Sequence, residues 1–414
     1  MSKLRARRVL ALLLTSCVGS SALAESFSLE RIEALARERA PAIAAAQARV
    51  DQAKGRRRSA AAVPDLDVTL GSAHARPEGG GISGSEWLVA AGVDLPAPWV
   101  LSARKKAGDD AIRAATADLD ATILDVVLEA RRTYVEVVIA EDRAASMAEA
   151  ARDADTLRNL ISRRVEIGEA AESDRLRAHV EARRTALEAN AARADTEGAR
   201  GALDGFLLGA LGPDFRLTSR LTTQELQPAP ENAVESALAA SPDLLAARAR
   251  FAAAASRLNA ERRARVPVFR IAAFRDSELD KTATGGAVTF AIPLWNRNQG
   301  PVLVARAEQT EAEAELARIE AVLRTSIARL VARDGAARER ALAYAEEIVP
   351  AARDTLSIST LALEQGEASL LPWLEARRSY LEVLRASLDA RRDAFLTRAE
   401  LDRLLGAHHA TQTR

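Results

Sequence analysis

The chain has 414 residues, of which 48% are hydrophobic and 28% are charged, but only 4% are aromatic. So few aromatic side chains argue against a large enzyme, which usually needs them to fill its core and to line a substrate pocket. Ala, Leu, Arg and Glu dominate the sequence, a composition typical of long, closely packed helices. Basic and acidic residues balance at 58 each, so no basic field indicates nucleic-acid binding, and one cysteine excludes an intrachain disulfide.

The first 24 residues have the features of an export signal. A basic stretch over residues 1–8 precedes an apolar run over 9–14, and small residues at positions 22 and 24 precede a cleavage point. This pattern predicts a signal peptide spanning residues 1–24. The run Leu14-Thr15-Ser16-Cys17 has the form of a bacterial lipobox, which would instead make 1–16 a lipoprotein leader and Cys17 the lipidated first residue. Both alternatives predict an exported protein.

The remaining chain contains a twofold internal repeat. Prolines at 41 and 242 follow similar helical openings, Val-Pro pairs follow at 63–64 and 266–267, and Gly-Glu-Ala runs follow at 168–170 and 366–368. The landmarks keep one order at offsets of 201, 203 and 198 residues. We therefore expect a first repeat over 25–215, a linker over 216–232, a second repeat over 233–405 and a tail over 406–414. Chance similarity among alanine-rich helices is the alternative, but it does not account for the paired strand segments.

Each repeat has two segments in which apolar and polar residues alternate: about 65–72 and 86–95, then about 268–275 and 286–293. Such alternation fits half-buried antiparallel strands, and it also fits barrel staves with one face toward lipid. No segment after the leader has the ~20 apolar residues of a membrane-spanning helix, so any crossing must use strands. Four strands cannot close a barrel, but three chains would supply twelve. The predicted membrane-facing residues are Leu66, Val68, Leu70, Trp87, Val89, Phe269, Ile271, Val288 and Phe290.

A very long helical stretch follows each strand pair, at about 102–166 and 302–365. The first has one glycine and no proline, and at ~1.5 Å per residue it would reach roughly 95 Å. Apolar steps of three, four or seven residues in the second predict a coiled-coil seam. Pro350 predicts a kink or break near Val349. A soluble bundle of short helices is the alternative, but these stretches mostly lack the turns that it needs.

Basic residues gather where the helices adjoin the strands, at 56–58, 104–106, 262–265 and 297. Helix C-termini favour cations, which accounts for the first and third clusters, whereas helix beginnings disfavour them. The clusters at 104–106 and 297 need another explanation. Basic residues at the same height beside a barrel rim would contact lipid phosphates, so outer-membrane lipid is a predicted partner. Coincidence is the alternative.

Taken in order, these features resemble the TolC-type outer-membrane efflux factor family. The matching elements are the paired openings, the strand pairs that end at Pro96 and Pro293, the two Gly-Glu-Ala reversals, and the segment Leu371–Arg377. The similarity covers nearly the whole mature chain. The short length and residues 168–178 are most similar to the outer-membrane subunits of heavy-metal resistance-nodulation-division efflux systems.

The resemblance implies a mainly α fold with a small β part and an internal duplication. In it, a long coiled-coil helical tunnel continues a twelve-stranded outer-membrane β-barrel, which a homotrimer builds from four antiparallel strands per chain. Such a trimer acts as a passive efflux duct together with a periplasmic adaptor protein and an inner-membrane pump, and divalent metal cations are a possible cargo. The expected location is the outer membrane, with the tunnel reaching into the periplasm.

Site residues follow from the same resemblance. The helix tips formed by Gly168, Glu169, Gly366 and Glu367 would dock the adaptor. Asp174 and Glu375 are candidates for carboxylates that narrow the lumen, although Pro372 stands where the family frequently has a second acid. An ordinary solvated helix face is the alternative for both carboxylates.

No enzyme signature accompanies these features. The sequence has no Gly-rich phosphate loop, no HExxH and no GxSxG, and His74 and His179 have no ligand partner nearby in the sequence. We therefore expect no catalytic site, no cofactor, no bound metal and no nucleic-acid partner. An exported coiled-coil scaffold without a pore is the rival hypothesis.

Overall fold

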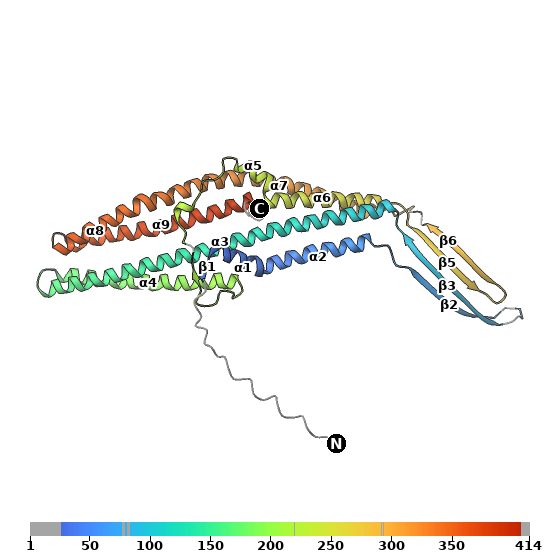
Figure 1. Ribbon diagram of the computed structural model, residues 1–414, viewed down its shortest axis with the longest axis horizontal. Helices are drawn as coiled ribbons and strands as arrows, with labels where there is room; N and C mark the ends of the chain where they lie inside the picture. Colours follow the sequence, from blue (N-terminus) through green and yellow to red (C-terminus); the bar gives the residue numbers. More distant parts are fainter. Residues whose placement is uncertain are drawn as a thin grey trace, which may run out of the picture.

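The computed structural model describes residues 26–76, 79–80, 83–218, 220–290, 292 and 294–406. In this part of the chain, long helices lie side by side, and a four-stranded sheet continues them at one end of an elongated molecule (Figure 1). The predicted leader, Cys17 and residues 407–414 lie outside the described residues.

The same order of elements occurs twice. Each half has a short helix, a medium helix that begins with a proline, a strand hairpin and a pair of long helices, and proline suits a first helical turn because its φ is already fixed there. The first half comprises α1 (Leu29–Arg39), α2 (Pro41–Ala61), β2 (Asp67–Ala75), β3 (Gly84–Leu95), α3 (Pro98–Glu166) and α4 (Glu172–Phe206). The second comprises α5 (Ala233–Ala240), α6 (Pro242–Arg263), β5 (Phe269–Ser277), β6 (Thr282–Phe290), α7 (Gln299–Ala343), η2 (Tyr344–Ile348), α8 (Val349–Gln365) and α9 (Leu370–Leu405).

The segment between the halves is partly structured. Arg216–Leu217 forms β4, which pairs in parallel with β1 (Ser26–Phe27), and Thr223–Glu225 forms the short 3₁₀ helix η1. The predicted linker is therefore attached to the beginning of the described chain, near the middle of the helical body (Figure 1).

The two long helical stretches differ in continuity. α3 runs for 69 residues without a break and starts at Pro98, four residues before the predicted start. Its counterpart is divided by η2, a single π-helical turn that ends two residues before Pro350. A proline lacks the N–H and crowds the carbonyl four residues earlier, and a π turn shifts the hydrogen-bond register there. The predicted kink near Val349 is thus a π turn, and the helix continues through it.

The sheet has the strand order β2-β3-β5-β6, and every pair is antiparallel. β3 and β5 join the two halves, which leaves β2 and β6 at the edges of the described sheet. The hairpins reach farther from the helices than predicted, since β2 extends to Ala75 and β6 begins at Thr282. Backbone pairing continues through these residues although their side chains break the apolar alternation. Leu66 lies just before β2, so its assignment to a strand was wrong.

The strand register gathers the predicted apolar residues on one face of the sheet, whereas the other face is mixed and carries Leu88 and Phe274 beside its polar residues. Leu70 pairs with Val89, and Ile271 pairs with both Val93 and Val288, so their side chains share one face. Phe269 and Phe290 also pair on it, with ring centroids 6.3 Å apart. These apolar side chains are exposed or partly exposed in the single chain. An exposed apolar face of this extent indicates that something else covers it.

Charged residues at the helix-proximal end occupy the opposite face. The guanidinium group of Arg270 lies 2.9 Å from a carboxylate oxygen of Asp67 and 3.2 Å from one of Asp94. To reach β2 from β5 it crosses Gly92 on β3, where a Cβ atom would lie 3.1 Å from Nη2. These two ion pairs tie together three of the strands.

Helix packing in the body depends on alanines and on a few larger side chains. Beneath the sheet α3 packs against α2 and α6, and α6 packs against α7. At mid-length Tyr134 and Ala130 are fully buried, and Arg131 bridges Glu33 of α1 at 2.6 Å and Asp402 of α9 at 3.3 Å. Within the described ranges, no helix combines the length and the apolar composition needed to cross a lipid bilayer.

Candidate functional site

The two predicted helix tips lie together at the end of the molecule farthest from the sheet (Figure 1). Gly168 and Gly366 end α3 and α8 with φ values of 81° and 79°, the left-handed region that glycine adopts without strain. The N–H of Glu169 donates to the carbonyl oxygen of Arg164 at 2.8 Å, and that of Glu367 donates to Ala362 at 2.9 Å. Both tips therefore have the same left-handed helix cap, and all four predicted tip residues are exposed.

Arg164 links the two tips to each other. Its Nη1 and Nη2 atoms donate to the carbonyl oxygens of Leu363 and Glu364 at 2.8 and 2.7 Å, at the C-terminal end of α8. A cation is favoured there because the last carbonyls of a helix carry partial negative charge. The sequence analysis did not identify this residue, since one arginine in an arginine-rich helix gives no sign of its partner.

The tip glycines give a test of backbone strain. Gly366→Ala should destabilise the α8–α9 turn by about 1–2 kcal/mol, because an alanine in the left-handed region meets its own carbonyl. Gly335→Ala in the exposed middle of α7 is the matched control and should be neutral or stabilising, by up to about 1 kcal/mol. Thermal unfolding of both variants checks the opposite signs. If both variants changed the unfolding temperature equally, backbone strain at the tip would not be the cause.

The two lumen candidates lie on different hairpins. Asp174 is in the first turn of α4 and forms an ion pair with Arg177 at 3.2 Å. Glu375 is exposed on α9, and within the described residues it has no ion-pair partner. No hydrogen bond or ion pair joins the two carboxylates in this part of the chain, so a single chain does not assemble them into one site.

A buried charged cluster lies between the hairpins, about two helical turns from the tips. Arg377 of α9 is 2% exposed and donates to Glu181 Oε1 of α4 at 2.6 Å and to the Ala150 carbonyl oxygen of α3 at 2.6 Å. Its guanidinium group also lies 5.4 Å from the ring centroid of Trp373. Burial lowers the pKa of Arg377, and Glu181 opposes that shift. The cluster joins three helices, and its pairing could not be predicted from the sequence.

Asp153 lies close enough to this cluster to respond to its charges. Partial desolvation raises the pKa of the Asp153 carboxyl above its ordinary value although the residue stays exposed, the charge of Glu149 adds to the effect, and Arg377 opposes it. The folded state therefore holds the proton more tightly than the unfolded chain does. At pH values above its pKa in the folded protein, ionised Asp153 therefore lowers the free energy of unfolding. This loss disappears as the pH falls below the pKa that Asp153 has in the unfolded chain.

Asp153→Asn should accordingly raise the unfolding temperature slightly at pH 7, since solvent screens this exposed residue, and the gain should shrink as the pH is lowered to about 4. Asp155→Asn is the control, because that carboxylate is also exposed but forms an ion pair with Arg158 at 2.8 Å. Thermal unfolding at the two pH values measures both variants. A gain that is constant with pH would show that the charge of Asp153 is not its cause.

No group of three or more histidine, cysteine or acidic side chains in the described ranges is arranged to hold a metal ion. The predicted membrane-facing residues other than Leu66 share the apolar face of the sheet, as the strand register shows.

A family described as outer membrane efflux protein matches residues 34–209 and 233–407. The chain belongs to this family of outer membrane efflux proteins.

Similar proteins agree with this assignment. This efflux protein is 26% identical over 308 residues to the cobalt-zinc-cadmium resistance protein CzcC of Cupriavidus metallidurans, an alignment that covers 74% of this chain and 73% of the relative. Its fold matches a membrane protein from Pseudomonas aeruginosa with a TM-score of 0.78 at 19% identity, covering 91% of this chain and 90% of the other. It also matches the MtrE outer membrane channel of Neisseria gonorrhoeae with a TM-score of 0.76 at 20% identity, covering 91% and 88%.

These findings confirm the predicted fold class, a mainly α chain with a small antiparallel sheet and the architecture of TolC-type channels. The efflux protein is an outer-membrane channel subunit of a tripartite efflux system, located in the outer membrane and extending into the periplasm. Its family consists of passive channels and not of enzymes.

Proposed function

We propose that three copies of this efflux protein close into one passive, non-enzymatic duct with a twelve-stranded barrel. The observation that carries the proposal is the four-stranded sheet, which has an exposed apolar face and two edge strands. Unpaired sheet edges favour association with another chain. If β6 of each chain paired with β2 of the next, every edge would be satisfied, and the apolar faces would form one continuous outer surface.

The distribution of side chains along the strands supports an orientation in the membrane. On the apolar face Phe269 and Phe290 lie at the end near the helices, and Trp87 lies toward the far end, with the guanidinium group of Arg275 5.9 Å from its ring centroid. Aromatic side chains at both margins of an apolar band are typical of barrels in lipid. The opposite face, with Asp67, Asp94 and Arg270, would then line the lumen.

At the other end, the paired tips would dock a periplasmic adaptor linked to an inner-membrane pump. Gly168, Glu169, Gly366 and Glu367 are exposed on two equivalent turns that project together, away from the sheet. Asp174 and Glu375 lie within a few turns of these tips and, as carboxylates repeated in three chains, would narrow the lumen there.

Divalent metal cations are the proposed cargo, because the curated relative CzcC is named for cobalt, zinc and cadmium resistance. The test compares efflux of labelled cobalt, zinc and cadmium from cells with and without this chain. Slower efflux without the chain is expected, and equal fluxes would reject the metal assignment. Conductance of the purified protein in planar bilayers tests the duct separately, since a coiled-coil scaffold without a pore would give none.

A further inference from the structure

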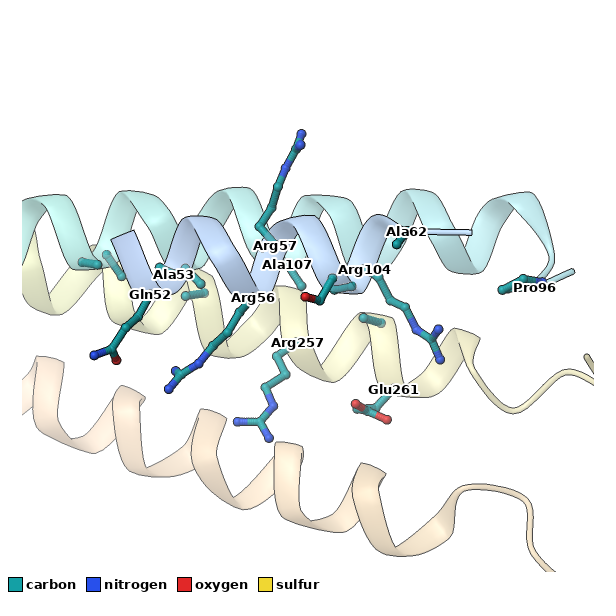
Figure 2. A pocket seen from close by; sticks show the side chains of 18 of the residues that line it. Gln52, Ala53, Arg56, Arg57, Ala62, Pro96, Arg104, Ala107, Arg257 and Glu261 are labelled. Atoms are coloured by element: carbon teal, nitrogen blue, oxygen red, sulfur yellow. The ribbon is translucent and has the colours of Figure 1, made fainter. Parts of the chain in front are cut away.

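A basic groove lies on the helical body next to the sheet. It has a volume of about 1240 Å³, and its walls come from α2, α3 and α6 (Figure 2). Five arginines line it together with three carboxylates, so the lining carries a positive excess although the whole chain has no net charge. The charged lining residues are Arg49, Arg56, Arg57, Arg104, Arg257, Asp65, Asp118 and Glu261.

Three of these arginines lie at one level of the helices. Arg56 and Arg257 precede the ends of α2 and α6 by five and six residues, and Arg104 follows the start of α3 by six. At ~1.5 Å per residue, each lies roughly 8–9 Å from the junction with the strands. Figure 2 shows Arg56, Arg104 and Arg257 directed to the same side, whereas Arg57 points away from them.

The guanidinium groups of the groove differ in whether a described residue pairs with them. Arg57 forms an ion pair with Asp109 at 2.9 Å, and Arg257 forms one with Glu308 at 2.8 Å. In the part of the chain that the structure describes, Arg49, Arg56 and Arg104 form no ion pair or hydrogen bond through their side chains. Three charged donors that line one groove without partners among the described residues are available for an anion from solution.

The packing order of the helices determines which side of the duct the groove faces. α3 packs between α2 and α6, and α6 packs against α7, so α2 and α7 are the edges of this helical layer. A neighbouring chain would add at those edges and would leave the groove open. Because α3 forms the floor and α2 and α6 form the walls, the groove lies on the concave side of the layer. In a closed tunnel, the concave side is the interior, so Arg104 would face the lumen and not the lipid phosphates predicted for the cluster at 104–106.

We propose that this groove is an anion-binding band inside the duct, next to the barrel, which takes small multivalent anions that carry carboxylate or phosphate groups. The inference rests on the proposed trimeric duct. Guanidinium groups pair with two oxygens of such anions at once, and this geometry favours them over chloride. Their field extends over about 8 Å at physiological salt, so the three unpaired arginines of each chain act on solutes that pass along its wall.

The test measures conductance of the reconstituted trimer in planar bilayers in potassium chloride, with citrate as the probe anion. Citrate should reduce the conductance of the wild type reversibly. The double variant Arg56→Gln/Arg104→Gln, which removes two unpaired charges and breaks no ion pair, should need about tenfold more citrate for the same block. The matched control Arg58→Gln/Arg263→Gln removes two exposed arginines at a similar level that do not line the groove, and it should keep the wild-type sensitivity.

An open wild-type channel that citrate does not block would overturn the anion band, as would a block that persists unchanged in the groove variant. If the control variant lost its sensitivity to citrate as much as the groove variant, the block would depend on all the arginines near the barrel rim, including any that contact lipid. That result would also overturn the anion band. Absence of any conductance would instead reject the proposed duct. Trimer formation is checked on mild gels, so a failure of assembly is recognised before the block is compared.

Discussion

Val68→Arg is expected to prevent stable assembly in the outer membrane, whereas Thr69→Arg at the next residue should be tolerated. Val68 pairs with Ala91 in the middle row of the apolar face, and its side chain is 60% exposed in the single chain. A cation at the middle of the lipid-facing band costs about 2–4 kcal/mol in each chain, and a trimer would incur this cost three times. Thr69 projects from the opposite face, which would line the lumen of the proposed duct, where an arginine would remain hydrated.

Heat-resistant trimer in isolated outer membranes measures the effect, with total protein as the reference. We expect the Val68→Arg trimer to fall at least tenfold and the Thr69→Arg trimer to stay near the wild-type amount. If both variants assembled equally well, the apolar face would not contact lipid. If both failed equally, the strand itself and not its orientation would be the sensitive feature. Because the two positions are adjacent in one strand, local strand propensity affects them alike.

Arg377→Met should destabilise the tip hairpins by about 3–5 kcal/mol, because it leaves the carboxylate of Glu181 buried without its partner. Glu181 is 6% exposed, and its 2.6 Å contact with Arg377 is a buried ion pair between α4 and α9, which a more exposed pair between Arg385 and Glu188 also joins. The double variant Arg377→Met/Glu181→Leu removes both charges and should regain most of the stability. Arg340→Met, which breaks a surface pair with Asp393 at 2.7 Å, should cost no more than about 1 kcal/mol.

Thermal unfolding and protease cleavage near residue 366 compare these variants. The idea of a buried charge that needs its partner would be abandoned if Arg377→Met proved as mild as Arg340→Met. It would also fail if adding Glu181→Leu made the protein less stable than Arg377→Met alone. The size of the recovery separates the missing partner from the lost packing of Arg377 against Trp373.

Periodic features of the sequence were sufficient to predict the architecture. Alternation in segments such as Val68–Leu70 and Phe269–Ile271 identified strands, because a sheet with unlike faces requires a period of two. The lack of breaks before Gly168 identified the long helix, and the repeated Gly-Glu-Ala runs located both tips. Each of these signals lies within a short segment, so it can be recognised in the sequence without knowledge of the tertiary contacts.

Pairings between distant segments could not be predicted in the same way. Arg377 and Glu181 are 196 residues apart, and Arg164 and Leu363 are 199 apart, in helices with many equivalent charges. Which arginine is buried depends on helix rotation and packing, which alanine-rich sequence leaves open. The strand limits were missed for a related reason, because backbone pairing carried β2 past its apolar residues as far as Ala75. The tip and lumen residues remain predictions, since their roles depend on partner chains.

In the proposed duct, the unequal continuity of the two long helical stretches should give walls of different stiffness. α3 extends from the sheet to the tip as one uninterrupted rod of 69 residues, whereas the equivalent path in the second half passes through the π turn at Tyr344–Ile348. A π turn is a weak point in the hydrogen-bond ladder, so a load on both tips should bend the second path first. Each protomer would then supply one fixed wall and one hinged wall, and the hinge would sit about 20 residues from the tip that bends.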